Sequence, residues 1–76
     1  MKPKDTIEVG KLLIKAAGAD QVSQYVRIYK LSRHKTALVR PRDSIPNLVW
    51  RLIHQKVKDI GGCWSLTQEL WEVPLT

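Results

Sequence analysis

Residues 21–42 contain no acidic side chain, yet they are too rich in apolar residues to stay unfolded. This window carries six cations, and the other seven cations of the chain are matched by seven acidic residues. The net charge of +6 therefore resides in one stretch. Valine, isoleucine, leucine and tyrosine recur between the cations, so the folded window must bury one side and present a cationic side to solvent.

The segments on either side of this window both predict helices. Asp5 and Glu8 stand at capping-box spacing before an apolar helical repeat, and Gly18 is a natural end for that helix. Ser44 is expected to cap a second helix, because a proline suited to the first turn follows it. The apolar stripe of this second helix runs as far as a pair of glycines, which should terminate it.

The window itself fits two arrangements. Val22, Tyr25 and Tyr29 follow the spacing of one helix face, which favours a helix. Many of the same residues are β-branched or aromatic, so residues 24–40 could instead form a basic hairpin, with a C-terminal strand at 63–73. Such a hairpin would lack the Asn-Gly or Asp-Gly turn of a tight connection. We expect the helical arrangement, and the α/β arrangement is the alternative.

In the helical arrangement the window forms a helix-turn-helix, with its second helix at 33–40. The N-terminal end of such a recognition helix faces base edges in the major groove, where arginine pairs with guanine through two hydrogen bonds. Short polar groups suit phosphate oxygens, and cations beyond the helix hold the DNA backbone. The residues expected to contact DNA are Gln24, Lys30, Ser32, Arg33, His34, Lys35, Arg40 and Arg42.

Six short motifs follow one another along most of the chain. They are Ala17-Gly18, Gln21, Leu31-Ser32, Ile45-Pro46, Gly61-Gly62 and Thr67-Gln68-Glu69-Leu70. Their order resembles the small Cro-like repressors of phages and prophages, including the YdaS type. The resemblance implies a mainly α, lambda-repressor-like domain of about five short helices that binds operator DNA, commonly as a dimer. The chain departs from this family at Lys30, where the family has glycine, and at Val26, where it has alanine.

Three tryptophans lie in the C-terminal third of the chain. Trp64 and Trp71 are expected to complete a core that contains no phenylalanine. The alternative is a dimer contact, because tryptophan is enriched where binding energy is concentrated. The residues of this alternative contact are Trp50, Trp71, Val73 and Leu75. A symmetric dimer would present the basic face twice and would match a palindromic site.

Groups for catalysis and metal binding are sparse. The acidic residues are dispersed, and no spacing aligns a serine, a histidine and an aspartate. Cys63 is the one cysteine; we expect it to be buried, and with the two histidines it forms no cluster typical of zinc. We therefore expect no enzyme activity, no cofactor, no metal and no small-molecule substrate.

These observations lead to one expected function and two alternatives. We expect residues 1–76 to be a single, cytoplasmic DNA-binding domain, because the start is charged and no apolar run approaches the ~20 residues of a membrane span. Its role would be that of a transcriptional regulator of phage or plasmid type, a homodimeric repressor on double-stranded DNA. The alternatives are a small α/β protein-interaction module, acting as a phage-type inhibitor or adaptor, and an RNA-binding protein that uses the basic hairpin.

Overall fold

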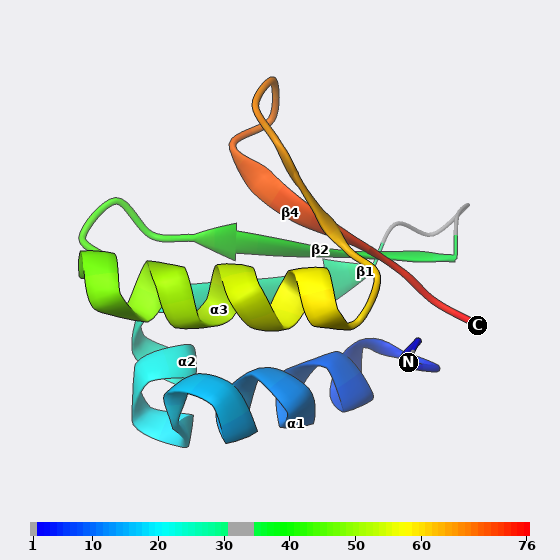
Figure 1. Ribbon diagram of the computed structural model, residues 1–76, viewed down its shortest axis with the longest axis horizontal. Coiled ribbons are helices and arrows are strands. Elements are labelled where there is room, and N and C mark those ends of the chain that lie inside the picture. Colours follow the sequence, from blue (N-terminus) through cyan, green and yellow to red (C-terminus); the bar gives the residue numbers. More distant parts are fainter. Residues whose placement is uncertain (1, 31–34) are drawn as a thin grey trace.

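The computed structural model describes residues 2–30 and 35–76, and in these ranges it contains three helices and four strands (Figure 1). In chain order the elements are α1 (Thr6–Ala17), α2 (Ala19–Tyr25), β1 (Val26–Lys30), β2 (Thr36–Pro41), α3 (Asn47–Asp59), β3 (Cys63–Ser65) and β4 (Leu70–Pro74). The strands form one antiparallel sheet in the order β1-β2-β4-β3. All three of these helices lie on the same side of the sheet, and among the described residues no helix covers its other face (Figure 1).

The expected mainly α fold with five helices is wrong, and the chain has the α/β arrangement instead. The helical stripe that begins in α2 ends at Tyr25, and Val26 is already extended with φ −133° and ψ 141°. In the extended form Val26 and Ile28 face the helices, whereas Arg27 between them is exposed. The two-residue alternation of a strand therefore separates apolar from cationic side chains, which suits β-branched residues better than a helix does.

The predicted start and end of α1 are confirmed. The side chain of Asp5 accepts a hydrogen bond of 2.9 Å from the backbone N–H of Glu8, which caps the first turn. Val9 and Leu13 are fully buried against the rest of the core. Gly18 ends the helix with a φ of 96°, a conformation that glycine adopts without strain. Local sequence chemistry is thus sufficient to define this element.

The start of α3 differs from the prediction. Ser44 does not cap the helix, because the first helical residue is Asn47 and Pro46 holds the cap position with an extended ψ of 146°. A residue before proline is biased away from the helical region, so Ile45 delays the start of the helix. The end agrees with expectation, since Gly61 follows the last turn with a φ of 90°. Between these ends Val49, Ile53, Val57 and the following Ile60 are buried in the core.

The C-terminal strand β4 lies inside the sheet rather than at its edge. It pairs with β2 on one side and with β3 on the other, so the edges of the sheet are β1 and β3. Three residues of the alternative dimer contact, Trp71, Val73 and Leu75, are buried within the chain itself. Beyond β4 the backbone N–H of Thr76 donates to the carbonyl oxygen of Pro3, which joins the two ends of the chain.

Gly62 provides a test of how tightly α3 packs on the sheet. A Cβ atom at Gly62 would lie 2.6 Å from Cγ1 of Val57 and 2.8 Å from the backbone oxygen of Glu72. We expect Gly62→Ala to lower the free energy of unfolding by about 1–3 kcal/mol in a denaturant titration. The control is Gly10→Ala in α1, whose Cβ would meet its nearest atom at an ordinary 3.7 Å. This control should raise stability by about 0.5–1 kcal/mol, and equal effects of the two changes would contradict the packing described.

Candidate nucleic-acid interface

The outward face of the β1–β2 hairpin carries cations and an aromatic ring. Strand alternation turns Arg27 and Tyr29 of β1 away from the helices, together with Leu38 and Arg40 of β2. The register pairs Arg27 with Arg40 and Tyr29 with Leu38, so the two arginines lie directly opposite each other. No helix of the described residues covers this side of the sheet (Figure 1). Arg27 and Arg40 are exposed on this face, although Leu38 beside them is buried.

In the described strands of this face no acidic residue stands directly opposite either arginine of the pair, and Glu72 is a diagonal neighbour of Arg40. Among the strand residues of this face, the acidic one is Glu72 of β4, which stands opposite Leu38 rather than opposite either arginine. Directly opposed side chains have Cβ atoms only about 5 Å apart, and two like charges at that distance destabilise a sheet. Both arginines are exposed, so water screens part of this repulsion. The pair is thus a small electrostatic cost to the folded chain.

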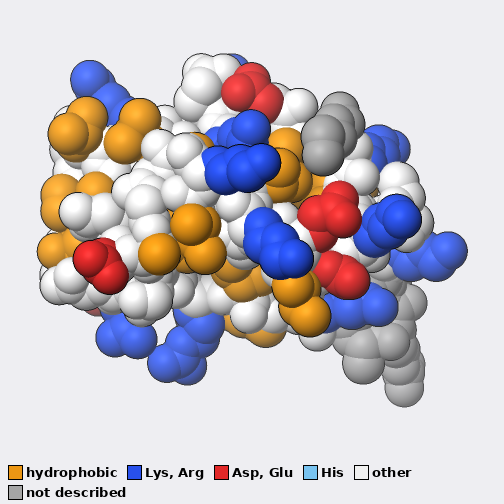
Figure 2. Space-filling view, turned by 90° about the horizontal axis from the view of Figure 1, so that it is seen from below, with side chains coloured by type: hydrophobic (Ala, Val, Ile, Leu, Met, Phe, Trp, Pro, Cys, Tyr) orange, Lys and Arg blue, Asp and Glu red, His pale blue; other side chains and the backbone are white. Residues whose placement is uncertain are grey.

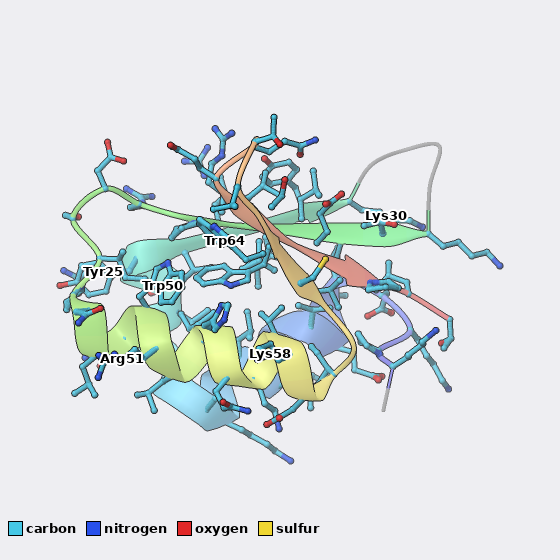
Figure 3. All side chains as sticks on the ribbon, turned by 45° about the horizontal axis from the view of Figure 1, so that its top comes forward. Tyr25, Lys30, Trp50, Arg51, Lys58 and Trp64 are labelled. Carbon is cyan, nitrogen blue, oxygen red and sulfur yellow. The ribbon has the colours of Figure 1, made fainter. Side chains whose placement is uncertain are left out.

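Further cations extend the basic surface along the hairpin. Lys30 and Lys35 are exposed at the end where the two strands connect, and Figure 3 shows Lys30 there. Arg42 is exposed just beyond the opposite end of β2. Its backbone N–H donates to the carbonyl oxygen of Tyr25 at 2.8 Å, which fixes this cation beside the start of β1. Arg42 thus lengthens the basic surface beyond the arginine pair, whereas Lys30, which pairs with the inward Ala37, adds positive charge at the other end of the hairpin on the opposite side of the strand.

The structure brings together four of the residues expected to contact DNA, namely Lys30, Lys35, Arg40 and Arg42, on or beside the hairpin. Gln24 is exposed but belongs to α2. The predicted contacts Ser32, Arg33 and His34 lie outside the described residues. Arg27 was not among the expected contacts, although its alternation with Val26 and Ile28 is the signal that places it outward on a strand.

The helical side of the molecule has a different character. Figure 2 shows that acidic side chains lie among the lysines and arginines there, with apolar groups between them. Glu8 in α1, Asp20 in α2 and Asp59 in α3 contribute negative charge to these elements. Lysines on this mixed surface can therefore serve as controls when cations of the hairpin are replaced.

Beneath the sheet, four aromatic rings form a cluster that ties α3 to β3 and β4. Trp50 stacks on His54 with centroids 4.6 Å apart and an interplanar angle of 12°. Trp64 meets both Trp50 and Trp71 edge to face, at 5.4 Å and 5.0 Å. The indole N–H of Trp71 donates to Nδ1 of His54 at 2.9 Å, which ties β4 to α3. The sequence prediction that Trp71 completes the core is confirmed.

An open hollow of about 400 Å³ adjoins this cluster, lined by Ile45, Asn47 and Trp50. It lies where the chain passes from β2 into α3. In Figure 3 Tyr25, Trp50 and Arg51 are labelled at this end of the molecule, far from Lys30. The hollow and the basic hairpin are therefore connected through the segment that carries Arg42.

The described part of the chain contains no candidate metal site, because no three His, Cys, Asp or Glu side chains lie close together there. Cys63 was expected to be buried, but it is a free and exposed thiol on the edge strand β3. No helix among residues 2–30 and 35–76 combines the length and the apolar character needed to cross a bilayer.

Comparison with known proteins returns no match to a protein-family model, to a curated protein or to a solved structure. The resemblance to Cro-like repressors thus stays a prediction from short motifs. The five-helix fold that it implied is not the fold observed.

The arginine pair makes a prediction about stability. Arg27→Thr removes the like-charge contact and should raise the free energy of unfolding by about 0.2–1 kcal/mol at low salt. At about 1 M salt the gain should shrink, because the screening length falls to about 3 Å. Lys30→Thr is the matched control on the same strand, since Lys30 stands opposite the uncharged Ala37. A salt-independent loss of stability in Arg27→Thr would contradict repulsion within the pair.

Proposed function

We propose that the protein binds nucleic acid through the outward face of the β1–β2 hairpin. The observation that carries the proposal is the direct opposition of Arg27 and Arg40 on a sheet face that no helix of the described residues covers. A phosphate between two guanidinium groups turns their repulsion into attraction, and each guanidinium can donate two parallel hydrogen bonds to phosphate oxygens. The pair that costs the free protein stability thus contributes to the complex.

The length of the basic surface supports a polymeric partner. Arg42 lies two residues beyond Arg40, and Lys30 and Lys35 carry further positive charge at the opposite end of the hairpin, about 10 Å along the strand from Arg27. Successive phosphates of a nucleic acid strand can meet several of these cations at once. Counterions released from the strand then favour binding, which makes the affinity depend steeply on salt.

The helix-turn-helix mechanism is not part of this proposal. That mechanism required residues 33–40 to form a recognition helix, and the described part of this range belongs to β2 from Thr36 onward. Sequence-specific operator binding depended on that helix for its contacts to base edges. The proposal rests on contacts to phosphate, which need only the exposed cations of the hairpin.

A second candidate function is recognition of an acidic protein surface by the same hairpin. The observation that favours it is the position of β1 at the edge of the sheet, where a partner strand can add to it. In this case polyglutamate should bind as tightly as an oligonucleotide of equal charge. Tighter binding of the oligonucleotide favours nucleic acid.

Charge removal tests the proposal. The variant replaces three cations of the hairpin surface by glutamine: Arg27, Arg40 and Arg42. The matched control replaces three exposed lysines of the helical side by glutamine: Lys11, Lys15 and Lys58. Both remove three charges from the net +6, so non-specific attraction falls equally. The measurement is fluorescence anisotropy of a labelled oligonucleotide over a series of salt concentrations.

The expected results differ sharply between the two variants. If all five described cations of the hairpin surface contact phosphate, the logarithm of the affinity should fall against that of salt with a slope of about −3.5 for a single strand and −4.5 for a duplex. In the hairpin variant the magnitude of this slope should fall by about 2 to 3, and the affinity should fall roughly tenfold or more. Both decreases should be much smaller in the control. Equal losses would show that the hairpin is not the interface, and no salt-dependent binding would contradict the function itself.

A further inference from the structure

The hollow at the start of α3 has the lining of a binding site for a small planar group. The hollow has a volume of about 400 Å³ and is open to solvent, so a ligand would lie against its wall with one side exposed. Ile45 and Trp50 supply apolar surface, and Asn47 supplies an exposed amide that can both donate and accept hydrogen bonds. Such a combination suits a flat, heteroaromatic group with polar edges.

Trp50 is held in place from several sides. His54 stacks on its ring at 4.6 Å, and Trp64 and Trp71 both lie 5.4 Å away between centroids. Among the described residues its indole N–H has no hydrogen-bond acceptor, and it is not a buried unsatisfied group, so the N–H reaches solvent. A ring that is already immobilised loses little conformational entropy when a ligand stacks on it. Trp50 is thus a preorganised wall of the hollow.

The residues that line the hollow are flanked in the chain by charged residues. Arg42 is fixed by two backbone hydrogen bonds, one to Tyr25 at 2.8 Å and one at 3.0 Å that its carbonyl accepts from the N–H of Ile45. Arg51 follows Trp50 in α3, and the exposed Asp43 lies between Arg42 and Ile45. The chain beside the hollow thus carries two cations and one acidic residue. An anionic ligand with an aromatic part suits this charge balance together with the ring of Trp50.

We propose that the hollow accepts one unpaired nucleobase against Trp50, while Arg42 holds a phosphate beside it. This inference rests on the proposed function and adds that the protein prefers single-stranded nucleic acid to duplex. A base within a duplex reaches the hollow only after it is unpaired and unstacked, which costs a few kcal/mol. In a single strand the base is free to stack, and basic surfaces with aromatic platforms bind single strands in this way.

The test compares the affinities of three labelled probes of the same length at one fixed salt concentration. The first is a 12-nucleotide single strand of mixed sequence, the second has the same backbone with every base absent, and the third is the matched duplex. Stacking of one base is worth about 1–3 kcal/mol, so the normal strand should bind about 5 to 150 times more tightly than the baseless strand. It should also bind at least about fivefold more tightly than the duplex.

Variants connect this preference to the hollow. Trp50→Ala should abolish the difference between the normal and the baseless strand, and Trp50→Phe should retain part of it because a ring remains. Because Trp50 packs against the core, Asn47→Ala is added as an exposed change that does not threaten folding, and it should reduce the difference. Leu66→Ala is the control, since Leu66 is 85% exposed in the turn between β3 and β4. It should leave the difference intact.

The outcomes separate the inference from the proposed function. Equal binding of the normal and the baseless strand overturns the base site and leaves phosphate binding by the hairpin in place. Duplex binding as tight as that of the single strand also overturns it. So does a result in which Trp50→Ala and Asn47→Ala both keep the full preference for the normal strand over the baseless strand. If no probe binds, the proposed function itself fails.

Discussion

The pairing of β2 with β4 is the interaction on which the rest of the structure depends. It joins Ala37 to Val73 and Val39 to Trp71, residues more than thirty positions apart in the chain. Once β2 lies in the middle of the sheet, its apolar side must face the helices, and Arg40 must face outward. β1 then follows the register of β2, which brings Arg27 opposite Arg40. The basic face is thus a consequence of a contact made by uncharged residues.

The same strand connects the core to the hollow. Trp71 in β4 is fully buried, and its indole N–H bonds to His54 of α3. His54 in turn supports the ring of Trp50, which lines the hollow. A buried donor without an acceptor would cost about 1–3 kcal/mol, so this bond couples the position of α3 to the sheet. Stability of the core and orientation of Trp50 therefore depend on shared contacts.

The sequence predicts those parts of the fold that local chemistry determines. The capping pair Asp5 and Glu8 and the terminating Gly18 and Gly61 act within one helix turn, and each behaves as expected. The concentration of positive charge also survives in the fold as a basic surface. The helix-turn-helix failed because its helical spacing in residues 22–29 is equally compatible with a short helix followed by a strand. The partner that decides between them, β4, lies far away in the sequence.

The candidate site shows the same division. Lys30, Lys35, Arg40 and Arg42 were expected to contact a polyanion, and they lie on or beside one hairpin. Arg27 could be identified as their neighbour only from the register of the two strands. The role of Trp50 beside the hollow depends on contacts among α3, β3 and β4, which no local pattern contains.

The most direct measurement is a nuclear magnetic resonance titration of the labelled protein with a single-stranded oligonucleotide. If the nucleic acid lies on the outward face of the hairpin and reaches the hollow, the largest shift changes should occur at Arg27, Arg40, Arg42 and the indole N–H of Trp50. Shift changes confined to Lys11 and Lys15 on the helical side, or no changes at all, would contradict this account.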